Sequence, residues 1–393
     1  MEMYTGPIFD ADQHYYEAID AFSRHVPKKM HKRCVQIAEI DGKTRHMVAG
    51  KVDNQVGNPS FNPISKPGVL REFFRGNPTG KTMIELIRSE LEQMPAEYMN
   101  RDARIERLAE QELEAAWLFP TLGVLYENSL GTDIQAATTL FEGFNRWLEE
   151  DWGLSYQDKL FSAPYLPLGD VDWACRELDW ALKKDARVIC VRPASVQTAK
   201  GRRACTDPQF DPFWARVNEA GITVIAHVAN SGYDSHGYGH GSSLEALGGG
   251  KPSVASLGTE RAINDWFLNM VYDRFFERFP NLRVGSVESG CSYLPSMMKK
   301  IEVSKSRSKG YYKEDPVELF KKHCWVNPFW EDNIKELVEL IGADSVILGS
   351  DFPHMEGMAN PRDLLEELDG ISVADQEKIL YTNAVGLNQL QPA

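Results

Sequence analysis

IFDADQHYYE, residues 8–17, begins as an apolar strand and ends in acids, a histidine and two tyrosines. Asp12 and His14 are two residues apart, so in a strand both side chains point to one face. A carboxylate beside an imidazole suits Zn, Mn or Fe. The same pair also occurs in surface turns and helix caps. The pair alone therefore does not distinguish a metal site from a turn or a cap.

Seven further apolar segments are typical of buried strands, and helical patterns lie near them. They are AAWLFPTLG (115–123), LFSAPYLPL (160–168), RVICVRPA (187–194), ITVIAHVAN (222–230), NLRVGSVESG (281–290), HCWVNPFW (323–330) and SVILGSDFPH (345–354). Alternating strands and helices indicate a parallel sheet covered by helices. Eight such units predict an α/β fold, a closed (β/α)8 or TIM barrel, formed as one domain by residues 1–393.

Two segments depart from a minimal barrel. Residues 25–100 follow the first strand and are rich in Gly, Pro and Asn, which predicts an inserted subdomain or lid. Residues 231–260 begin with a Gly-rich stretch after the fifth strand. Because long loops with little structure of their own commonly serve a function, we expect an active-site loop there.

Composition limits the partners and the compartment. A formal net charge of −14 repels phosphate backbones, so we expect no nucleic-acid partner. No apolar run reaches the ~20 residues of a membrane span, and the N-terminus lacks a secretory signal pattern. The six cysteines are scattered without a C-x-x-C pair, which favours a reduced, cytoplasmic protein. We expect a small-molecule substrate. The aromatic-rich helix at 262–279 is most simply a helix that covers the barrel, and the interface of a homodimer or of an oligomer with a related subunit is its second use.

Polar residues stand where the predicted strands end. Active sites of such barrels lie at the C-terminal ends of the strands. The candidate ligands of a divalent metal (Zn, Mn or Fe, one or two ions) are Asp12, His14, His227, Glu288 and Asp351, with Glu17 added if there are two ions. The candidate catalytic residues are Asp351, Glu288 and His354.

Four other side chains are candidates for substrate binding. Tyr15 offers a hydroxyl donor, although packing is an equal alternative. Arg192 suits a substrate carboxylate, although a structural salt bridge is the competing interpretation. His236 and His240 lie in the Gly-rich segment, where a solvated loop is the alternative.

Several motifs together resemble the amidohydrolase superfamily. They are Asp12-x-His14, the strand-end His227, VRPA (191–194), GSDFPH (349–354) and ILYTNAVGLNQL (379–390). The nearest branch is that of aminocarboxymuconate-semialdehyde decarboxylase, which includes hydroxybenzoate-type decarboxylases and hydrolases. The resemblance implies that Asp12, His14 and His227 are metal ligands. It implies that Asp351 contacts the metal or its water and moves protons.

Two positions depart from the family pattern. Asp12 stands where the family has His or Glu, and Glu288 stands where a His-x-Gly is usual. A carboxylate cannot replace a cationic imidazole, but it can bind metal or act as a base. The sequence therefore predicts a metal-dependent hydrolase or nonoxidative decarboxylase acting on a small cyclic, aromatic or carboxylated substrate.

Two alternatives stay open. Asp12, Glu17 and Glu288 also suit a dinuclear Fe or Mn/Fe site, which would make the protein an O2-dependent oxygenase (hydroxylase). The other alternative is a barrel without catalysis that serves as a partner subunit.

Overall fold

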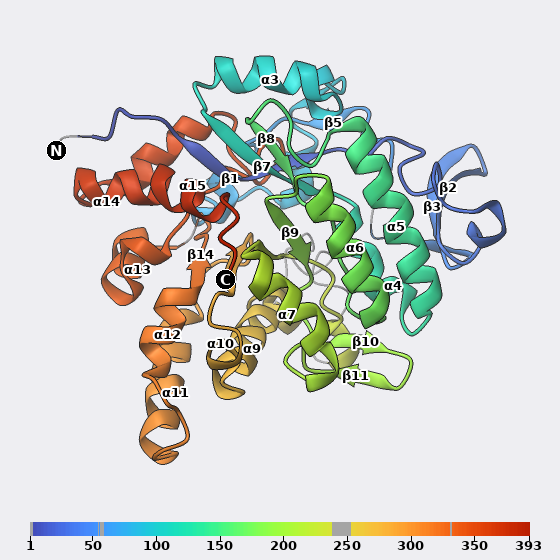
Figure 1. Cartoon of the computed structure of the whole chain (residues 1–393). Helices are drawn as coiled ribbons and strands as arrows, with labels where there is room; N and C mark the ends of the chain where they lie inside the picture. The colour runs from blue at the N-terminus through green and yellow to red at the C-terminus, as the bar shows by residue number, and fades with distance from the viewer. Residues whose placement is uncertain (1–2, 54, 56–58, 238–252, 331) are drawn as a thin grey trace.

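Short parallel strands surrounded by helices form the centre of the molecule (Figure 1). The computed structural model describes residues 3–53, 55, 59–237, 253–330 and 332–393. The parallel strands are β1 (Phe9–Tyr15), β7 (Ala115–Pro120), β8 (Leu160–Ser162), β9 (Val188–Val191), β12 (Thr223–His227), β13 (Arg283–Val287) and β14 (Cys324–Val326). They form two sheets, ordered β1-β7-β8 and β14-β13-β12-β9. Seven of the eight predicted strands are therefore present in the expected order.

Backbone hydrogen bonds join the two sheets through the residues that follow β8 in the chain. Cys190 of β9 donates to the carbonyl oxygen of Pro164 (2.9 Å) and accepts from the N–H of Leu166 (3.0 Å). Residues 163–166 thus continue β8 and pair with β9 of the other sheet. One gap of the ring is closed in this way.

Residues 346–352, the eighth predicted strand, close the other gap as an irregular extended segment. Ile347 N–H donates to Val326 O of β14 (3.1 Å). On the other side, Asp351 N–H donates to Asp12 O of β1 (2.8 Å). The eight segments therefore form a closed barrel, and the predicted fold is confirmed.

Helices cover the outside of the ring. They are α3 (Arg101–Glu110), α4 (Gly123–Leu130), α5 (Ile134–Asp151), α6 (Val171–Lys183), α7 (Asp211–Ala220), α9 (Gly258–Tyr272), α10 (Phe275–Arg278), α11 (Leu294–Arg307), α12 (Pro316–His323), α13 (Ile334–Ile341), α14 (Val373–Glu377) and α15 (Asn383–Leu387). The helix predicted at 262–279 is divided between α9 and α10. The division lies at Arg274, whose φ of 54° is incompatible with a continuous right-handed helix.

Short helical turns fill several connections. They are η1 (Lys28–Met30), η2 (Ala96–Tyr98), η3 (Pro208–Phe210), η4 (Tyr233–His236), η5 (Val254–Leu257), η6 (Ala343–Ser345), η7 (Pro361–Leu368) and η8 (Lys378–Thr382). The hairpin of β10 (Val196–Thr198) and β11 (Gly201–Arg203) follows β9.

The segment 25–100 has its own secondary structure. An antiparallel sheet contains β2 (Val35–Ile40), β3 (Lys43–Val48) and β4 (Lys51–Asp53), and Figure 1 shows β2 and β3 projecting at one side. A second part contains β5 (Ile64–Ser65), α1 (Arg71–Phe74), α2 (Met83–Ile87) and β6 (Leu91–Glu92). Ile64 and Tyr98 pack with Tyr16 and Phe352 in a small buried cluster. The insertion therefore packs on the chain next to the end of β1.

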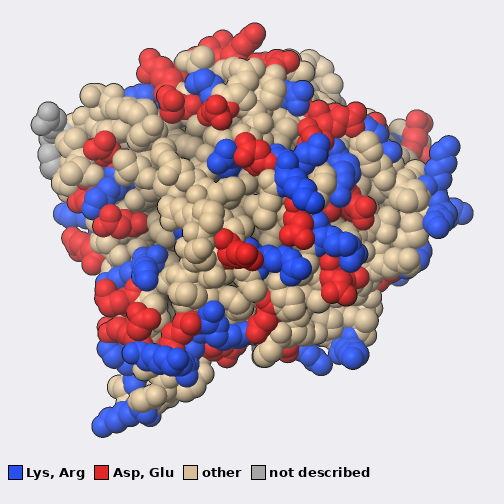
Figure 2. Space-filling model, in the orientation of Figure 1, with Lys and Arg blue, Asp and Glu red and all other residues tan. Residues whose placement is uncertain are grey.

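Charged side chains and cysteines differ in where they lie. Acidic and basic side chains are interspersed over the face shown in Figure 2. All six cysteines are free and buried. Among the described residues, no helix has both the length and the apolar character of a membrane span.

Candidate metal centre

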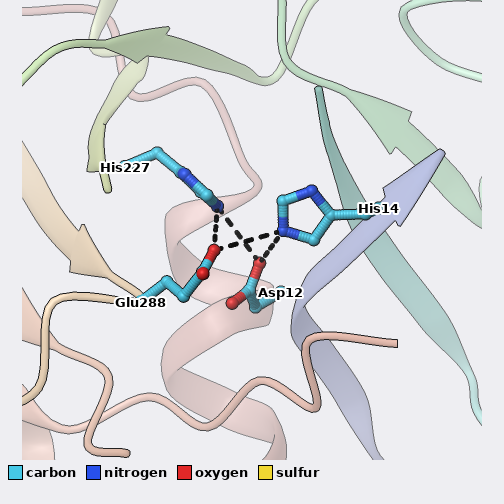
Figure 3. A group of neighbouring side chains, drawn as sticks. All are labelled: Asp12, His14, His227 and Glu288. Atoms are coloured by element: carbon cyan, nitrogen blue, oxygen red, sulfur yellow. Dashed lines mark ion pairs between the residues drawn. The ribbon is translucent and has the colours of Figure 1, made fainter. Parts of the chain in front are cut away.

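Four barrel segments bring five of the predicted side chains together. Asp12 and His14 come from β1, His227 ends β12, Glu288 follows β13, and Asp351 follows residues 346–350. Because all these segments are parallel, their C-terminal ends meet at one end of the barrel. Figure 3 shows Asp12, His14, His227 and Glu288 pointing toward one another.

The donor atoms are spaced as ligands of one ion would be. His14 Nε2 lies 3.4 Å from Asp12 Oδ1 and 3.3 Å from Asp351 Oδ1. Glu288 Oε2 lies 3.5 Å from His14 Nε2 and 3.4 Å from His227 Nε2. Nitrogen and oxygen ligands held about 2.0–2.2 Å from one ion lie roughly 3.0–3.5 Å from each other. The separations among Asp12, His14, His227 and Glu288 therefore fit a single ion, and Asp351 belongs to a second group of close donor atoms that shares His14 and Glu288.

The environment of His14 favours positive charge. Burial by itself lowers the pKa of His14, but the nearby carboxylates of Asp12 and Glu288 outweigh burial and raise this pKa to about 10. For Asp12, burial raises the pKa, yet the nearby imidazoles of His14 and His227 give a net lowering. Carboxylates that stabilise a proton on an imidazole would likewise stabilise a divalent cation.

Buried side-chain atoms without hydrogen-bond partners support a metal ion at this end of the barrel. Within the described part of the chain, both carboxylate oxygens of Asp12 and Asp351, and Nε2 of His14 and His227, are buried without a hydrogen-bond partner. His227 Nδ1 donates to the backbone oxygen of Val228 (2.9 Å), so in the neutral imidazole the lone pair is on Nε2. Buried polar atoms rarely lack partners, and these residue types fit Zn, Mn or Fe.

Glu288 is the most exposed side chain of the group and has a strained backbone. Its side chain is 16% exposed, whereas Asp12 and His14 are each 1% exposed. Glu288 therefore lies on the solvent side of the cluster. Both Glu288 and Asp351 have φ of 56°, a left-handed conformation that residues with a Cβ rarely adopt. Such strain is concentrated at functional sites.

Asp10, an alternative to Asp12 in a set of ligands for two ions, fixes the segment that carries Asp351. Its carboxylate accepts from the backbone N–H of Ser350 (2.8 Å), from the Ser350 hydroxyl (2.5 Å) and from Gln13 Nε2 (2.8 Å). Burial raises the pKa of Asp10 to about 6 despite these bonds. Asp10, the first residue of DADQH (10–14), thus has a structural role.

His354 is tied to both Asp351 and the backbone of β1. Thr121 Oγ1 donates to Tyr15 O (2.8 Å), so His354 Nε2 donates to Thr121 Oγ1 (2.9 Å). His354 Nδ1 then faces Asp351 Oδ1 at 2.7 Å. Burial lowers the pKa of His354 well below its usual value, which keeps the imidazole neutral. With its proton on Nε2, the neutral imidazole has a lone pair on Nδ1, so His354 is placed to accept a hydrogen bond from the protonated carboxyl group of Asp351.

Glu356 is an acid at the centre that the sequence analysis did not select. Its Oε2 is buried and, among the described residues, has no hydrogen-bond partner. Burial raises the pKa of Glu356 to about 7, and repulsion from Glu288 adds to this shift. Burial, followed by repulsion from Glu288 and Glu356, also raises the pKa of Asp351 well above its usual value. The position of Glu356, five residues after Asp351, is the one signal that the sequence offers.

Glu17, a candidate ligand of a second ion, is not in either group of close donor atoms among the described residues. Its Oε1 accepts from the backbone N–H groups of Leu122 (2.8 Å) and Gly123 (2.9 Å) at the beginning of α4. Burial raises the pKa of Glu17 to about 7, although these two hydrogen bonds oppose the shift. The carboxyl group thus fixes a helix N-terminus, where negative charge is favourable.

We expect Glu17→Ala to lower stability without changing metal content. The substitution leaves two buried N–H groups without an acceptor, which costs roughly 1–3 kcal/mol. Urea unfolding and elemental analysis of the same samples would check this. Glu39→Ala, on an exposed position of β2, is the control. A loss of bound metal in Glu17→Ala alone would return Glu17 to the set of ligands.

Two predicted substrate-binding residues lie elsewhere. Tyr15 is fully buried and packs against Trp147 and Trp152, with ring centroids 5.7 and 5.4 Å away. Arg192 Nη2 lies 3.3 Å from Glu127 Oε1 and donates to Ser195 O (3.1 Å). Tyr15 is therefore a core residue, and Arg192 forms the structural salt bridge that was its alternative.

The two histidines of the Gly-rich segment contribute nothing to the described centre. His236 is exposed in η4 and its ring lies 5.1 Å from that of Tyr233. His240 lies outside the described residues. Both stay predictions as substrate contacts.

Comparison with solved structures supports the barrel. A crystal structure of an amidohydrolase from Mycobacterium avium subsp. paratuberculosis K-10 matches with a TM-score of 0.91 at 36% identity, covering 98% of this chain and 100% of that chain. Dihydroxybenzoic acid decarboxylase from Polaromonas sp. JS666, solved with bound manganese and 2-nitroresorcinol, matches with a TM-score of 0.58 at 20% identity, covering 83% and 97%. At that identity the second match supports the fold alone.

Sequence comparison places the chain in a family. It is 29% identical over 132 residues to 2-amino-3-carboxymuconate-6-semialdehyde decarboxylase from Dictyostelium discoideum. That match spans 32% of this chain and only 36% of the relative. The profile of the amidohydrolase family matches residues 123–387, about two thirds of the sequence. The chain therefore belongs to the amidohydrolase family.

Proposed function

We propose that this protein is a metal-dependent hydrolase acting on a small cyclic or aromatic substrate. The observation that carries the proposal is the set of converging donor atoms on Asp12, His14, His227, Glu288 and Asp351. Their oxygens and imidazole nitrogens face one another at one end of the barrel. The predicted ligand set, without Glu17, is thus retained as a proposal.

The chain's own residues supply proton transfer. A divalent ion bound there would lower the pKa of water and polarise a carbonyl group. Asp351 is placed to accept a proton from the attacking water and, once protonated, to donate a hydrogen bond to His354 Nδ1, which lies 2.7 Å from its Oδ1. The same proton would then pass from Asp351 to the leaving group. Glu288, on the solvent side of the cluster, would help to hold the ion.

Nonoxidative decarboxylation is the second candidate. The Dictyostelium relative is named a decarboxylase, and this observation favours the reaction. Asp351 or Glu288 would then protonate a carbon atom of the substrate after carbon dioxide departs. The sequence match covers about a third of that relative, so this reaction is proposed beside hydrolysis and is not preferred to it.

The dinuclear oxygenase has less support. Two overlapping groups of close donor atoms exist among the described residues, one with Asp12 and His227, the other with Asp351 and His354. Both groups need His14 and Glu288. Because an imidazole nitrogen binds one ion, and because Glu17 is bonded to α4, one ion suits the site better than two.

We also propose that the insertion at residues 25–100 shapes access to the centre. Tyr16 packs against His354 with ring centroids 5.7 Å apart, and Phe61 of the insertion packs against Tyr16 at 4.7 Å. The segment 231–260 is proposed as an active-site loop. A dimer stays a prediction.

Asp351→Asn should lower kcat at least a hundredfold, because general acid–base groups contribute roughly 10²–10⁴ to the rate. The assay is a panel of lactones, aryl esters and amides offered to the manganese-loaded protein. Carbon dioxide release from hydroxybenzoates is measured in parallel. Asp344→Asn, exposed on η6, is the matched control and should leave turnover unchanged. Turnover that needs dioxygen, or full activity in Asp351→Asn, would contradict the proposal.

A further inference from the structure

We infer that Asp332 is a positioning residue for Glu288. The inference rests on the proposed function, in which Glu288 helps to hold the ion. It follows from the backbone of the turn after β13 and from the hydrogen bonds that fix this turn.

The turn that carries Glu288 is short and strained. β13 ends at Val287, and α11 begins at Leu294. Between them, Glu288 and Gly290 have positive φ angles of 56° and 63°. A residue with a Cβ adopts the left-handed region only where the surrounding structure fixes it there. The side chain of Glu288 therefore keeps its direction only if both ends of the turn are fixed.

Strand β12 fixes the first end of the turn. Val287 pairs with His227 in the parallel ladder, and the N–H of Val228 donates to Val287 O (3.1 Å). The strand that carries His227 thus also fixes the residue before Glu288. The ladder between β12 and β13 ends there, so a contact from elsewhere has to fix the rest of the turn.

Asp332 fixes the other end. Its Oδ2 accepts from the backbone N–H of Cys291 (2.9 Å) and from that of Phe329 (2.8 Å). The same oxygen lies 3.4 Å from the position that a Cβ would occupy at Gly290. One carboxylate oxygen thus joins the turn after β13 to the loop after β14. Hydrogen bonds to a carboxylate are stronger than those to a neutral acceptor, which suits a strained turn.

The segment of Asp351 is fixed in the same way. Asp351 also has a φ of 56°, and the preceding residue, Ser350, donates its backbone N–H to Asp10 (2.8 Å). In both places a carboxylate from a neighbouring part of the barrel accepts from the backbone beside a candidate ligand. Neither Asp10 nor Asp332 belongs to the groups of close donor atoms among the described residues. Asp332 therefore acts on the centre through the backbone.

Asp332→Ala should weaken manganese binding roughly 10–100-fold, the effect of removing a side chain that orients a metal ligand. Without an acceptor for the N–H of Cys291, the turn can leave its left-handed conformation, and Glu288 then turns away from the other donor atoms. Asp332→Asn keeps a carbonyl oxygen as the acceptor, so its manganese affinity should stay within about threefold of that of the unmodified protein.

The test is equilibrium dialysis of manganese against the full chain and its variants. Asp332→Ala is measured alone and combined with Glu288→Ala. If Asp332 acts through Glu288, Asp332→Ala should weaken binding by less than about threefold once Glu288 is removed. Asp315→Ala is the matched control. Asp315 accepts from the N–H of Val317 (3.0 Å) at the beginning of α12, so its loss should lower stability in urea and leave manganese affinity unchanged.

Three results would each contradict the inference. They are normal manganese affinity in a folded Asp332→Ala protein, the same loss in Asp332→Asn as in Asp332→Ala, and an equal loss with and without Glu288. Near-ultraviolet circular dichroism shows which variants fold. If Asp332→Ala does not, Asp332→Ser, whose side chain is shorter and ends in a single oxygen, replaces it with the same expectation.

The unmodified chain separates this inference from the function on which it rests. An unmodified chain that binds no manganese contradicts the proposed function, and the inference with it. Manganese bound by the unmodified chain, together with any of the three contrary results, contradicts positioning by Asp332 alone.

Discussion

Gly349→Ala should destabilise the protein by about 3 kcal/mol or more, at the upper end of overpacking substitutions. A Cβ at Gly349 would lie 2.1 Å from Asp12 Cβ, 2.6 Å from Asp12 N and 2.8 Å from Asp12 Cα. Two of these atoms are backbone, so no side-chain rotation relieves the clash. The segment 346–352 would have to move away from β1 exactly where the barrel closes, and Asp12 and Asp351 would separate. Urea unfolding and manganese titration would check both effects.

Gly386→Ala is the matched control for this substitution. Apart from its chain neighbours and its own helix backbone, no atom of the described residues lies within 4 Å of the position that a Cβ would occupy at Gly386, and the residue is in α15. Alanine is favoured over glycine in a helix by roughly 0.5–1 kcal/mol, so stability should stay level or rise slightly. If Gly349→Ala unfolded at the same urea concentration as Gly386→Ala, the close approach of the two segments would be disproved.

The barrel was predictable because its pattern is local and repeated. Near-continuous apolar segments alternate with amphipathic ones, and parallel topology then places all strand C-termini at one end. Asp12, His227 and Asp351 therefore come together without any knowledge of loop structure. Only the irregular eighth segment differs from the prediction, since it pairs with both neighbours without regular strand geometry.

The different surroundings of the residues at the end of β1 have a simple physical cause. Side chains of a strand alternate, so Asp12, His14 and Tyr16 share one face, and Tyr15 and Glu17 belong to the other. The structure follows this rule: Tyr16 contacts His354, whereas Tyr15 packs against Trp147 and Trp152. Strict use of the period of two would have removed Tyr15 and Glu17 from the site.

Other features depend on contacts that no local pattern reveals. Asp10 bonds to Ser350, a residue 340 positions later in the chain. Arg192 pairs with Glu127 of α4. A sequence can show that such residues are polar within apolar surroundings, but only the folded chain selects the partner that satisfies them.

His227→Ala should weaken manganese binding more than a hundredfold. Residues that merely orient metal ligands change metal affinity by roughly 10–100-fold, so removal of a ligand itself should exceed that range. His227 Nε2 lies 3.5 Å from Asp12 Oδ1 and 3.4 Å from Glu288 Oε2, so its loss opens one side of the donor set. Equilibrium dialysis with elemental analysis measures the affinity.

Two further variants, His25→Ala and His227→Gln, test whether the loss of manganese is due to the missing imidazole nitrogen of His227. His25 is exposed and pairs with Glu150 at 2.7 Å, so its removal should leave manganese affinity unchanged. His227 also packs against Phe119, with ring centroids 4.8 Å apart, and alanine leaves a cavity there. Glutamine fills more of that space but lacks the imidazole nitrogen, so His227→Gln should fold better and still lose manganese. Manganese affinity that survived in a folded His227→Gln protein would mean that His227 packs the barrel end and does not bind the ion.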